Sequence, residues 1–133
     1  MDINSLNVIT LAYIGDAVFE IYIREKILNK NIVRIEQLQK EVTKYVSAKG
    51  QAKALNELMD KDVLTDVELD IVKRGRNYKR GTHPHHTDII TYKYATGLEA
   101  LIGYLYLKKD IDRLKEILDE IEVNTCISME RMS

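Results

Sequence analysis

The chain has 133 residues, 45% of them hydrophobic and 31% charged, which fits one globular domain and excludes a disordered or fibrous protein. Its 20 Lys and Arg residues face 21 Asp and Glu residues, for a net charge of −1, and this balance excludes a uniformly basic protein. The lone Cys126 cannot form an intramolecular disulfide and the longest apolar run is too short for a membrane span, so we expect a cytoplasmic protein with no membrane segment.

The first predicted helix covers residues 6–28 and is long and amphipathic. The apolar row that we expect to face the core is Leu11, Ile14, Val18, Ile21 and Leu28. On another face, Asp16, Glu20 and Arg24 follow one another at four-residue steps. Glu20 precedes Arg24 in the order that favours an ion pair on a helix. The Asn-Lys-Asn sequence at residues 29–31 predicts the end of this helix.

A second helix is predicted over residues 36–59, with an apolar row that includes Val42 and Leu55. Its other face carries Lys40, Lys44, Ser47 and Gln51. Next, Thr65 and Glu68 have the spacing of a capping box, which predicts a short helix that ends near Gly75.

The segment 74–87 is predicted to be a loop, because it holds two glycines and the only proline and lacks an apolar period. A buried helix should follow from residue 87 or 88 to residue 107, and a last amphipathic helix should begin after Asp110 as its N-cap. No segment alternates with period two. The predicted fold is therefore all-α, a single domain of about five to seven helices.

Two carboxylates occupy unusual helical positions. Asp16 follows Gly15, which costs about 1 kcal/mol relative to Ala in a helix, and Glu99 lies in a strongly apolar helix with Gly103 one turn further on. If the two glycines mark a close crossing, Asp16 and Glu99 meet, and two such anions repel unless a cation lies between them. Mg²⁺ suits one or two carboxylates. Spacing alone leaves open that each acid is a solvated surface residue.

These motifs resemble those of a known enzyme family. Residues 11–20 (LAYIGDAVFE) resemble the signature helix of the ribonuclease III catalytic domain, and residues 98–107 (LEALIGYLYL) resemble its second acidic motif, in matching order and separation. The whole chain resembles the Mini-ribonuclease III subfamily, which has this catalytic domain and no double-stranded-RNA-binding domain. The resemblance covers nearly the whole chain, including residues 46–52, 74–77 and 91–94. It implies that residues 1–133 form one ribonuclease III-like catalytic domain without a separate RNA-binding domain.

The resemblance implies a metal-dependent endoribonuclease that cleaves double-stranded RNA as a homodimer. Asp16 and Glu99 match two family acids, which implies that they are catalytic and bind Mg²⁺, with Mn²⁺ as a substitute; Gly15, Glu20 and Gly103 would support them. The subfamily's substrate is the precursor of large-subunit (23S) ribosomal RNA, and a ribosomal protein assists.

Two positions depart from the wider family, because Ala12 and Thr96 stand where it has acids. Both departures are characteristic of the Mini-ribonuclease III branch, and they leave the number of metal ions open. They also keep an alternative open, namely a non-catalytic RNA-binding module for ribosome assembly that retains the fold.

A basic segment precedes the second acidic motif. Between residues 73 and 86 there are five Lys or Arg residues and no acid, whereas the rest of the chain has 15 basic and 21 acidic residues. Such local charge suits a phosphate backbone. The predicted RNA-binding residues are Arg74, Arg76, Asn77, Lys79 and Arg80, with Ser47 and Gln51 as weaker candidates. His83, His85 and His86 fit no standard zinc spacing, and solvation is their simplest explanation.

Overall fold

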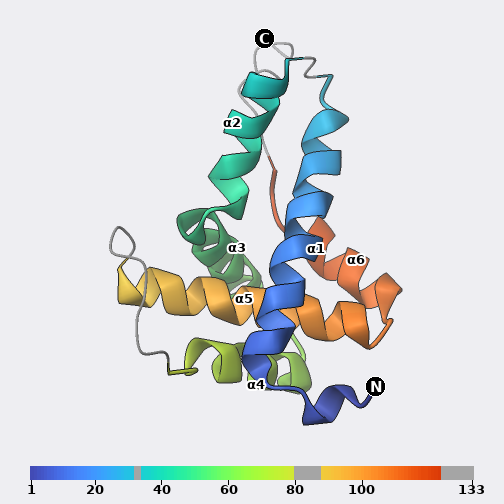
Figure 1. The fold of residues 1–133 in the computed structure, drawn as a ribbon, viewed down its shortest axis with the longest axis vertical. Helices are drawn as coiled ribbons and strands as arrows, with labels where there is room; N and C mark the ends of the chain where they lie inside the picture. The colour runs from blue at the N-terminus through green and yellow to red at the C-terminus, as the bar shows by residue number, and fades with distance from the viewer. Residues whose placement is uncertain (32–33, 80–87, 124–133) are drawn as a thin grey trace.

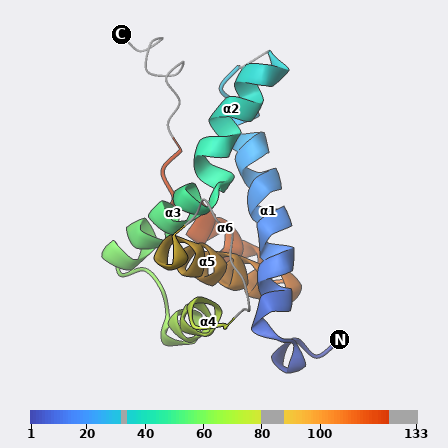
Figure 2. The ribbon, with the colours of Figure 1, turned by 60° about the vertical axis from the view of Figure 1, so that its left-hand side comes forward.

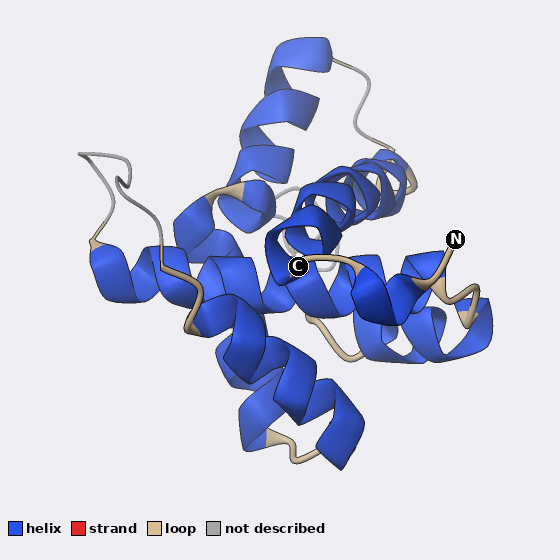
Figure 3. Ribbon diagram, turned by 60° about the horizontal axis from the view of Figure 1, so that its bottom comes forward, coloured by secondary structure: helices blue, strands red, loops and turns tan. Residues whose placement is uncertain are grey.

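The computed structural model describes residues 1–31, 34–79 and 88–123, and all regular structure in these ranges is helical (Figure 3). The predicted all-α class is therefore confirmed. A short 3₁₀ helix at Ile3–Ser5 comes first. The α-helices of the described ranges are α1 (Val8–Leu28), α2 (Ile35–Val46), α3 (Ala48–Asp60), α4 (Asp66–Arg76), α5 (Ile89–Leu107) and α6 (Ile111–Asp119). None of these helices combines the length and the apolar character that crossing a membrane requires.

Helix α5 passes through the middle of the molecule, and α1, α3 and α4 pack directly against it (Figure 1). Figure 2 shows α4 below α5 and the pair of α1 and α2 rising above it. Helix α5 is apolar on nearly all sides, which is typical of a helix enclosed by others. Its Leu98, Leu101 and Ile102 are fully buried in one core with Phe19 of α1 and Leu58 of α3.

Two glycines allow α1 and α5 to cross with their backbones in contact. A Cβ atom on Gly15 would overlap the carbonyl oxygen of Glu99, and a Cβ atom on Gly103 would overlap the carbonyl oxygen of Leu11. No residue larger than glycine fits at either position without moving a helix. The close crossing that the sequence predicted at Gly15 and Gly103 is confirmed.

The first helix forms as predicted and ends at Leu28, with Asn29 as its C-cap, but its predicted core face is wrong. Of the expected apolar row only Leu11 is fully buried, while Ile21 and Leu28 are 59% and 55% exposed. The face that packs against the core instead carries Ala12, Gly15, Phe19, Ile23 and Ile27. Because α1 is apolar around most of its circumference, periodicity could not choose between its faces, and the glycine crossing decides the orientation.

The predicted single helix over residues 36–59 is also wrong, since the chain turns at Ser47 between α2 and α3. Ser47 has an extended backbone, and its side-chain oxygen accepts a hydrogen bond from the Gly50 N–H, so it caps α3. Gly50 packs so closely on the backbone of Lys44 and Tyr45 that a Cβ atom would overlap it. Apolar residues continue at helical spacing across this corner, so their periodicity does not indicate that the helix ends there.

The predicted beginnings of the last three helices are confirmed. Thr65 and Glu68 form the reciprocal hydrogen bonds of a capping box at α4. The side chain of Asp88 accepts a hydrogen bond from the Thr91 N–H at α5, and Asp110 caps α6. Each cap satisfies N–H groups that the first helical turn leaves without partners.

A buried ion pair ties α4 to α6. The Arg113 guanidinium donates to both carboxylate oxygens of Glu68, at 2.7 and 2.8 Å, and also to the carbonyl oxygen of Val63 at 2.6 Å. The Glu68 side chain is only 5% exposed. Its hydrogen bonds with Arg113 hold the pKa of Glu68 below its usual value of 4.5, although burial opposes this.

Replacing Gly15 by Ala should prevent α1 and α5 from reaching their native separation. We expect Gly15→Ala to lower the free energy of unfolding by about 3 kcal/mol or more, because the added methyl group meets backbone that cannot yield by a rotamer change. Urea denaturation followed by circular dichroism measures the loss. Thr10→Ala, at an exposed position of the same helix, is the control and should change stability little. A Gly15→Ala protein as stable as the Thr10→Ala protein would contradict the observed crossing.

The Glu68–Arg113 pair predicts a dependence of stability on pH. Because the pKa of Glu68 is lower in the folded protein, its contribution is complete well above pH 4.5 and is lost as the pH falls through the folded value. We expect Glu68→Gln to reduce the free energy of unfolding by about 1.5–3 kcal/mol at pH 7. This difference from the wild type should shrink in acid. Urea denaturation at pH 7 and at several acidic values measures it, and a difference that stays constant would argue against the charged pair.

Candidate active site

The α1–α5 crossing brings together the backbone segments that carry Asp16 and Glu99, the two acids that the sequence singled out. Gly15, which directly precedes Asp16, contacts the backbone of Glu99 on the facing helix. Asp16 is exposed and Glu99 is half-buried. The crossing therefore places the backbones of two acids, 83 positions apart in the sequence, next to each other, and solvent reaches both residues.

A third helix reaches the same place through Gln51. Gln51 is 2% exposed, and its side-chain amide donates a hydrogen bond to the Asp16 carboxylate at 3.3 Å. The sequence predicted Gln51 as an RNA contact on an outer face of its helix, and this RNA role stays a prediction. The contact with Asp16 was missed, although the spacing of Gln51 with the buried Ala54, Leu55 and Leu58 indicated an inward position.

The two positions at which the chain lacks family acids are enclosed by protein. Ala12 lies one turn before Asp16 and is 4% exposed, and Thr96 lies three residues before Glu99 and is 5% exposed. The Thr96 hydroxyl donates to the carbonyl oxygen of Tyr92 at 3.0 Å, so it is satisfied within its own helix. Within residues 1–31, 34–79 and 88–123, no three His, Cys, Asp or Glu side chains form a group that could hold a metal ion.

The remaining supporting residue, Glu20, lies one turn beyond Asp16 on α1. It forms the expected ion pair with Arg24, at 2.8 Å, and both side chains are largely exposed. An exposed pair of this kind contributes little to stability. The charge of Glu20 is thus offset by Arg24, and its catalytic support for Asp16 stays a prediction.

Part of the basic segment is helical, which corrects the predicted loop over residues 74–87. Arg74 and Arg76 lie in the last turn of α4, Asn77 is its C-cap, and Lys79 follows in an exposed position. The Arg76 guanidinium lies over the Tyr94 ring of α5, 5.7 Å from the ring centre. Basic residues at a helix C-terminus interact favourably with the helix dipole, which explains why the helix extends through them. The predicted RNA contact Arg80 lies outside the described residues, as do the three histidines of this segment, His83, His85 and His86.

Ser47, the other predicted RNA contact, has a structural role in the fold. Its hydroxyl oxygen caps α3, and this α3 turn also holds Gln51 against Asp16. The hydroxyl hydrogen of a capping serine can still be donated outward. Ser47 therefore lies at the edge of the site, and its contact with RNA stays a prediction.

The candidate site has acidic residues that can bind a cation and basic residues that can bind phosphate. Two carboxylates on a rigid helix crossing offer oxygen ligands for a hard cation, while the exposed Arg74 and Lys79 at the end of α4 offer donors for phosphate. Such a combination suits hydrolysis of a phosphodiester.

Comparison with known proteins identifies the family. The model of the ribonuclease III domain matches residues 9–110. Mini-ribonuclease 3 of Thermoanaerobacter sp. is 48% identical over 115 residues, which cover 86% of this chain and 80% of that protein. Mini-ribonuclease 3 of Staphylococcus aureus is 46% identical over 119 residues, which cover 90% and 89% respectively. An X-ray crystal structure of a protein from Fusobacterium nucleatum matches with a TM-score of 0.77 at 35% identity, covering 89% of this chain and 93% of that one.

The chain therefore belongs to the ribonuclease III family, and this membership makes it an endoribonuclease. Within that family, its relatives place it in the Mini-ribonuclease III subfamily. The resemblance expected from the two acidic motifs is thus confirmed.

Proposed function

We propose that the protein is a metal-dependent endoribonuclease that cleaves double-stranded RNA, with Asp16 and Glu99 as its catalytic acids. The observation that carries the proposal is the backbone contact between Gly15 and Glu99, which unites the two acidic motifs at one exposed locus. By analogy with the subfamily, the natural substrate is the precursor of 23S ribosomal RNA, with a ribosomal protein as an assisting partner. Residues 1–133 act as a single catalytic domain in this proposal.

The donor set fits a hard divalent cation. Carboxylate oxygens are preferred ligands of Mg²⁺ and Mn²⁺, and Mg²⁺ keeps several waters when it binds one or two carboxylates. Asp16 and Glu99 would hold the ion, and the buried Ala12 and Thr96 offer no further carboxylate. When bound, the metal would supply an activated water and would neutralise charge on the scissile phosphate.

The protein's own residues divide the remaining tasks. The Gln51 amide restrains the Asp16 carboxylate from a buried position, so that Asp16 keeps one orientation. The cations at the end of α4 bind phosphate oxygens and fix the position of the duplex without reading its sequence. RNA affinity should accordingly weaken as the salt concentration rises.

The sharpest test removes one carboxylate charge. In Asp16→Asn the new side chain keeps nearly the same volume and still accepts a hydrogen bond from Gln51, so the fold should persist. We expect duplex RNA cleavage in Mg²⁺ to fall at least about a hundredfold, while RNA binding and circular dichroism stay normal. Glu25→Gln, an exposed acid on the same helix, should cleave normally.

Two outcomes would contradict the proposal. Near-normal cleavage by Asp16→Asn would remove this acid from the mechanism. The wild type could also bind duplex RNA but fail to cleave it over a wide range of Mg²⁺ concentrations. The protein would then be a non-catalytic RNA-binding module, an alternative favoured by the lack of acids at Ala12 and Thr96.

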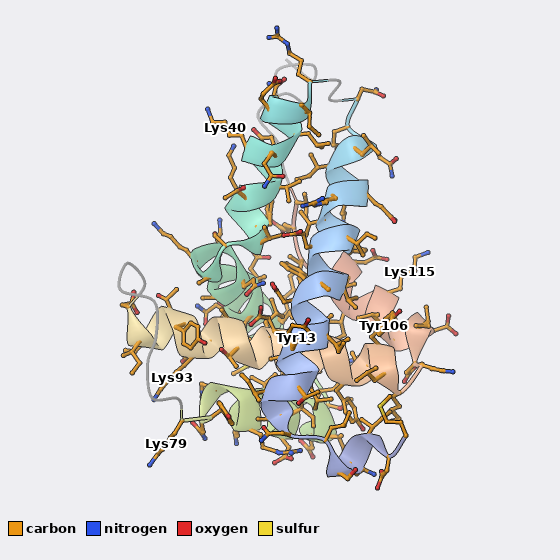
Figure 4. All side chains as sticks on the ribbon, in the orientation of Figure 1. Tyr13, Lys40, Lys79, Lys93, Tyr106 and Lys115 are labelled. Atoms are coloured by element: carbon orange, nitrogen blue, oxygen red, sulfur yellow. The ribbon has the colours of Figure 1, made fainter. Side chains whose placement is uncertain are left out.

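We also infer that the enzyme works as a homodimer through the exposed apolar face of α1. Tyr13 is 78% exposed and Ile21 is 59% exposed, and both share this face with Ala17. Tyr106 of α5 is exposed as well, and Figure 4 marks it together with Tyr13. Exposed apolar side chains that line up at helical spacing, two of them large, are unusual on a solvated surface, and a two-fold contact between two copies would cover them.

A charge placed in this face should separate the subunits. We expect Ile21→Asp to convert the dimer into a monomer, because the dimer interface would bury the new carboxylates of both subunits. Sedimentation velocity measures the mass of the particle in solution. Ile111→Asp is the matched control, since Ile111 is also an exposed isoleucine but lies at the start of α6. A monomeric wild type, or a dimeric Ile21→Asp protein, would refute the dimer.

A further inference from the structure

Gln51 differs from the other buried polar side chains in the kind of residue that it contacts. The described ranges of the chain hold four buried polar or charged side chains, Glu41, Gln51, Glu68 and Thr96. Glu41 and Thr96 bond within their own helices, and Glu68 ties α4 to α6. Of the four, only Gln51 donates to a candidate catalytic acid, Asp16. Its hydrogen bond is therefore a property of the candidate site rather than of the core.

A glutamine is unexpected at this position of α3. Gln51 shares the inward face of the helix with Leu55 and Leu58, which lie one and two turns further on and are at most 1% exposed. An apolar side chain there would avoid the cost of taking an amide out of water. A sequence departs from its own core pattern mainly at functional or strained sites. The departure at Gln51 thus indicates a function for its amide.

Rigid backbone holds both partners of the hydrogen bond. Gly15 packs on the backbone of Glu99, which fixes α1 directly before Asp16. Helix α3 packs on α5 beside this crossing (Figure 1), and Ala52, the residue after Gln51, is buried. Because Gln51 is 2% exposed, water competes little for its amide, which strengthens the hydrogen bond. The contact is therefore a lasting feature of the fold, unlike a contact between two surface side chains.

The hydrogen bond makes the two oxygens of the Asp16 carboxylate different. Oδ1 accepts from Nε2 of Gln51 at 3.3 Å. Within residues 1–31, 34–79 and 88–123, no other hydrogen bond or ion pair engages this carboxylate. Oδ2 is therefore the oxygen that is open to a cation, and engagement of Oδ1 disfavours binding of an ion through both oxygens.

Divalent cations differ in what they require of a carboxylate. Mg²⁺ binds single carboxylate oxygens and keeps several waters, and Mn²⁺ suits the same octahedral oxygen sites. Ca²⁺ takes about six to eight oxygens and commonly binds both oxygens of one carboxylate. Ala12 and Thr96, which are buried and carry no carboxylate, add no oxygen ligands that would offset a single-oxygen Asp16.

We propose that Gln51 is a positioning residue that sets the cation preference of the site. By engaging one oxygen of Asp16, it favours Mg²⁺ and Mn²⁺ over Ca²⁺. This inference rests on the proposed metal-dependent function and adds to it a reason for the choice of ion. Gln51 acts on the ion through Asp16 and is not itself a ligand.

The test compares the affinities of the wild type and of Gln51→Met for Mn²⁺ and Ca²⁺, without RNA. Methionine has nearly the length of glutamine but no donor, so the fold should persist while both oxygens of Asp16 become available. Electron paramagnetic resonance of free Mn²⁺ gives the Mn²⁺ affinity, and displacement of Mn²⁺ by Ca²⁺ gives the Ca²⁺ affinity. We expect the wild type to prefer Mn²⁺, and the ratio of the Mn²⁺ to the Ca²⁺ affinity to fall about tenfold in Gln51→Met.

Three further variants sharpen the comparison. Gln37→Met makes the same substitution at an exposed position of α2 and should keep the wild-type ratio. Gln51→Glu replaces the donor by further oxygen ligands, and its ratio should fall at least as far as that of Gln51→Met. Asp16→Asn should lose Mn²⁺ binding at the site. Circular dichroism checks that each variant is folded.

The contrary results separate this inference from the function on which it rests. A folded Gln51→Met or Gln51→Glu protein with the wild-type ratio would overturn the role of Gln51. An equal loss of affinity for both ions would also overturn it, because a purely structural role predicts that loss. A wild type that binds Ca²⁺ as tightly as Mn²⁺ would contradict the preference itself. If Asp16→Asn binds Mn²⁺ as tightly as the wild type, the ion lies elsewhere and the proposed metal site is refuted.

Discussion

The backbone contact of α1 and α5 at Gly15 and Gly103 is the constraint on which the rest of the molecule depends. It fixes which face of α1 packs against the core, because only one rotation of the helix presents Gly15 to the facing backbone. It also holds the backbone beside Asp16 against the backbone of Glu99. The same two glycines that disfavour each helix intrinsically are therefore required for the fold and for the site.

The glycine crossing explains why three helices are enough to supply the residues of the candidate site. Glu99 comes from the centre of the most enclosed helix, and Asp16 comes from the outer helix that crosses it (Figure 1). Helix α3 adds Gln51, which stabilises the orientation of Asp16 from a buried position. Rigid elements thus hold each group, so that in the proposed mechanism little reorganisation is needed when the substrate arrives.

Local signals in the sequence predicted the helices and most of their ends. Caps at Thr65, Asp88 and Asp110 involve neighbours within three residues, which a sequence displays directly. The family motifs likewise predicted that Asp16 and Glu99 act together; this pairing stays a proposal, and the structure shows the backbone contact between Gly15 and Glu99. The break at Ser47 was missed because an apolar row continues across it, and the core face of α1 was missed because apolar residues surround that helix. The Gln51–Asp16 contact depends on tertiary packing, which periodicity alone does not specify.

In the proposed mechanism, Asp16 and Glu99 together bind one divalent cation at the helix crossing. The most direct measurement is anomalous X-ray scattering from crystals grown with Mn²⁺. We expect an anomalous peak between the two carboxylates, from an ion bound to them directly or through a shared water shell, and we expect this peak to be lost in Asp16→Asn crystals. A saturated crystal with no peak at the crossing, or with Mn²⁺ bound only elsewhere, would contradict it.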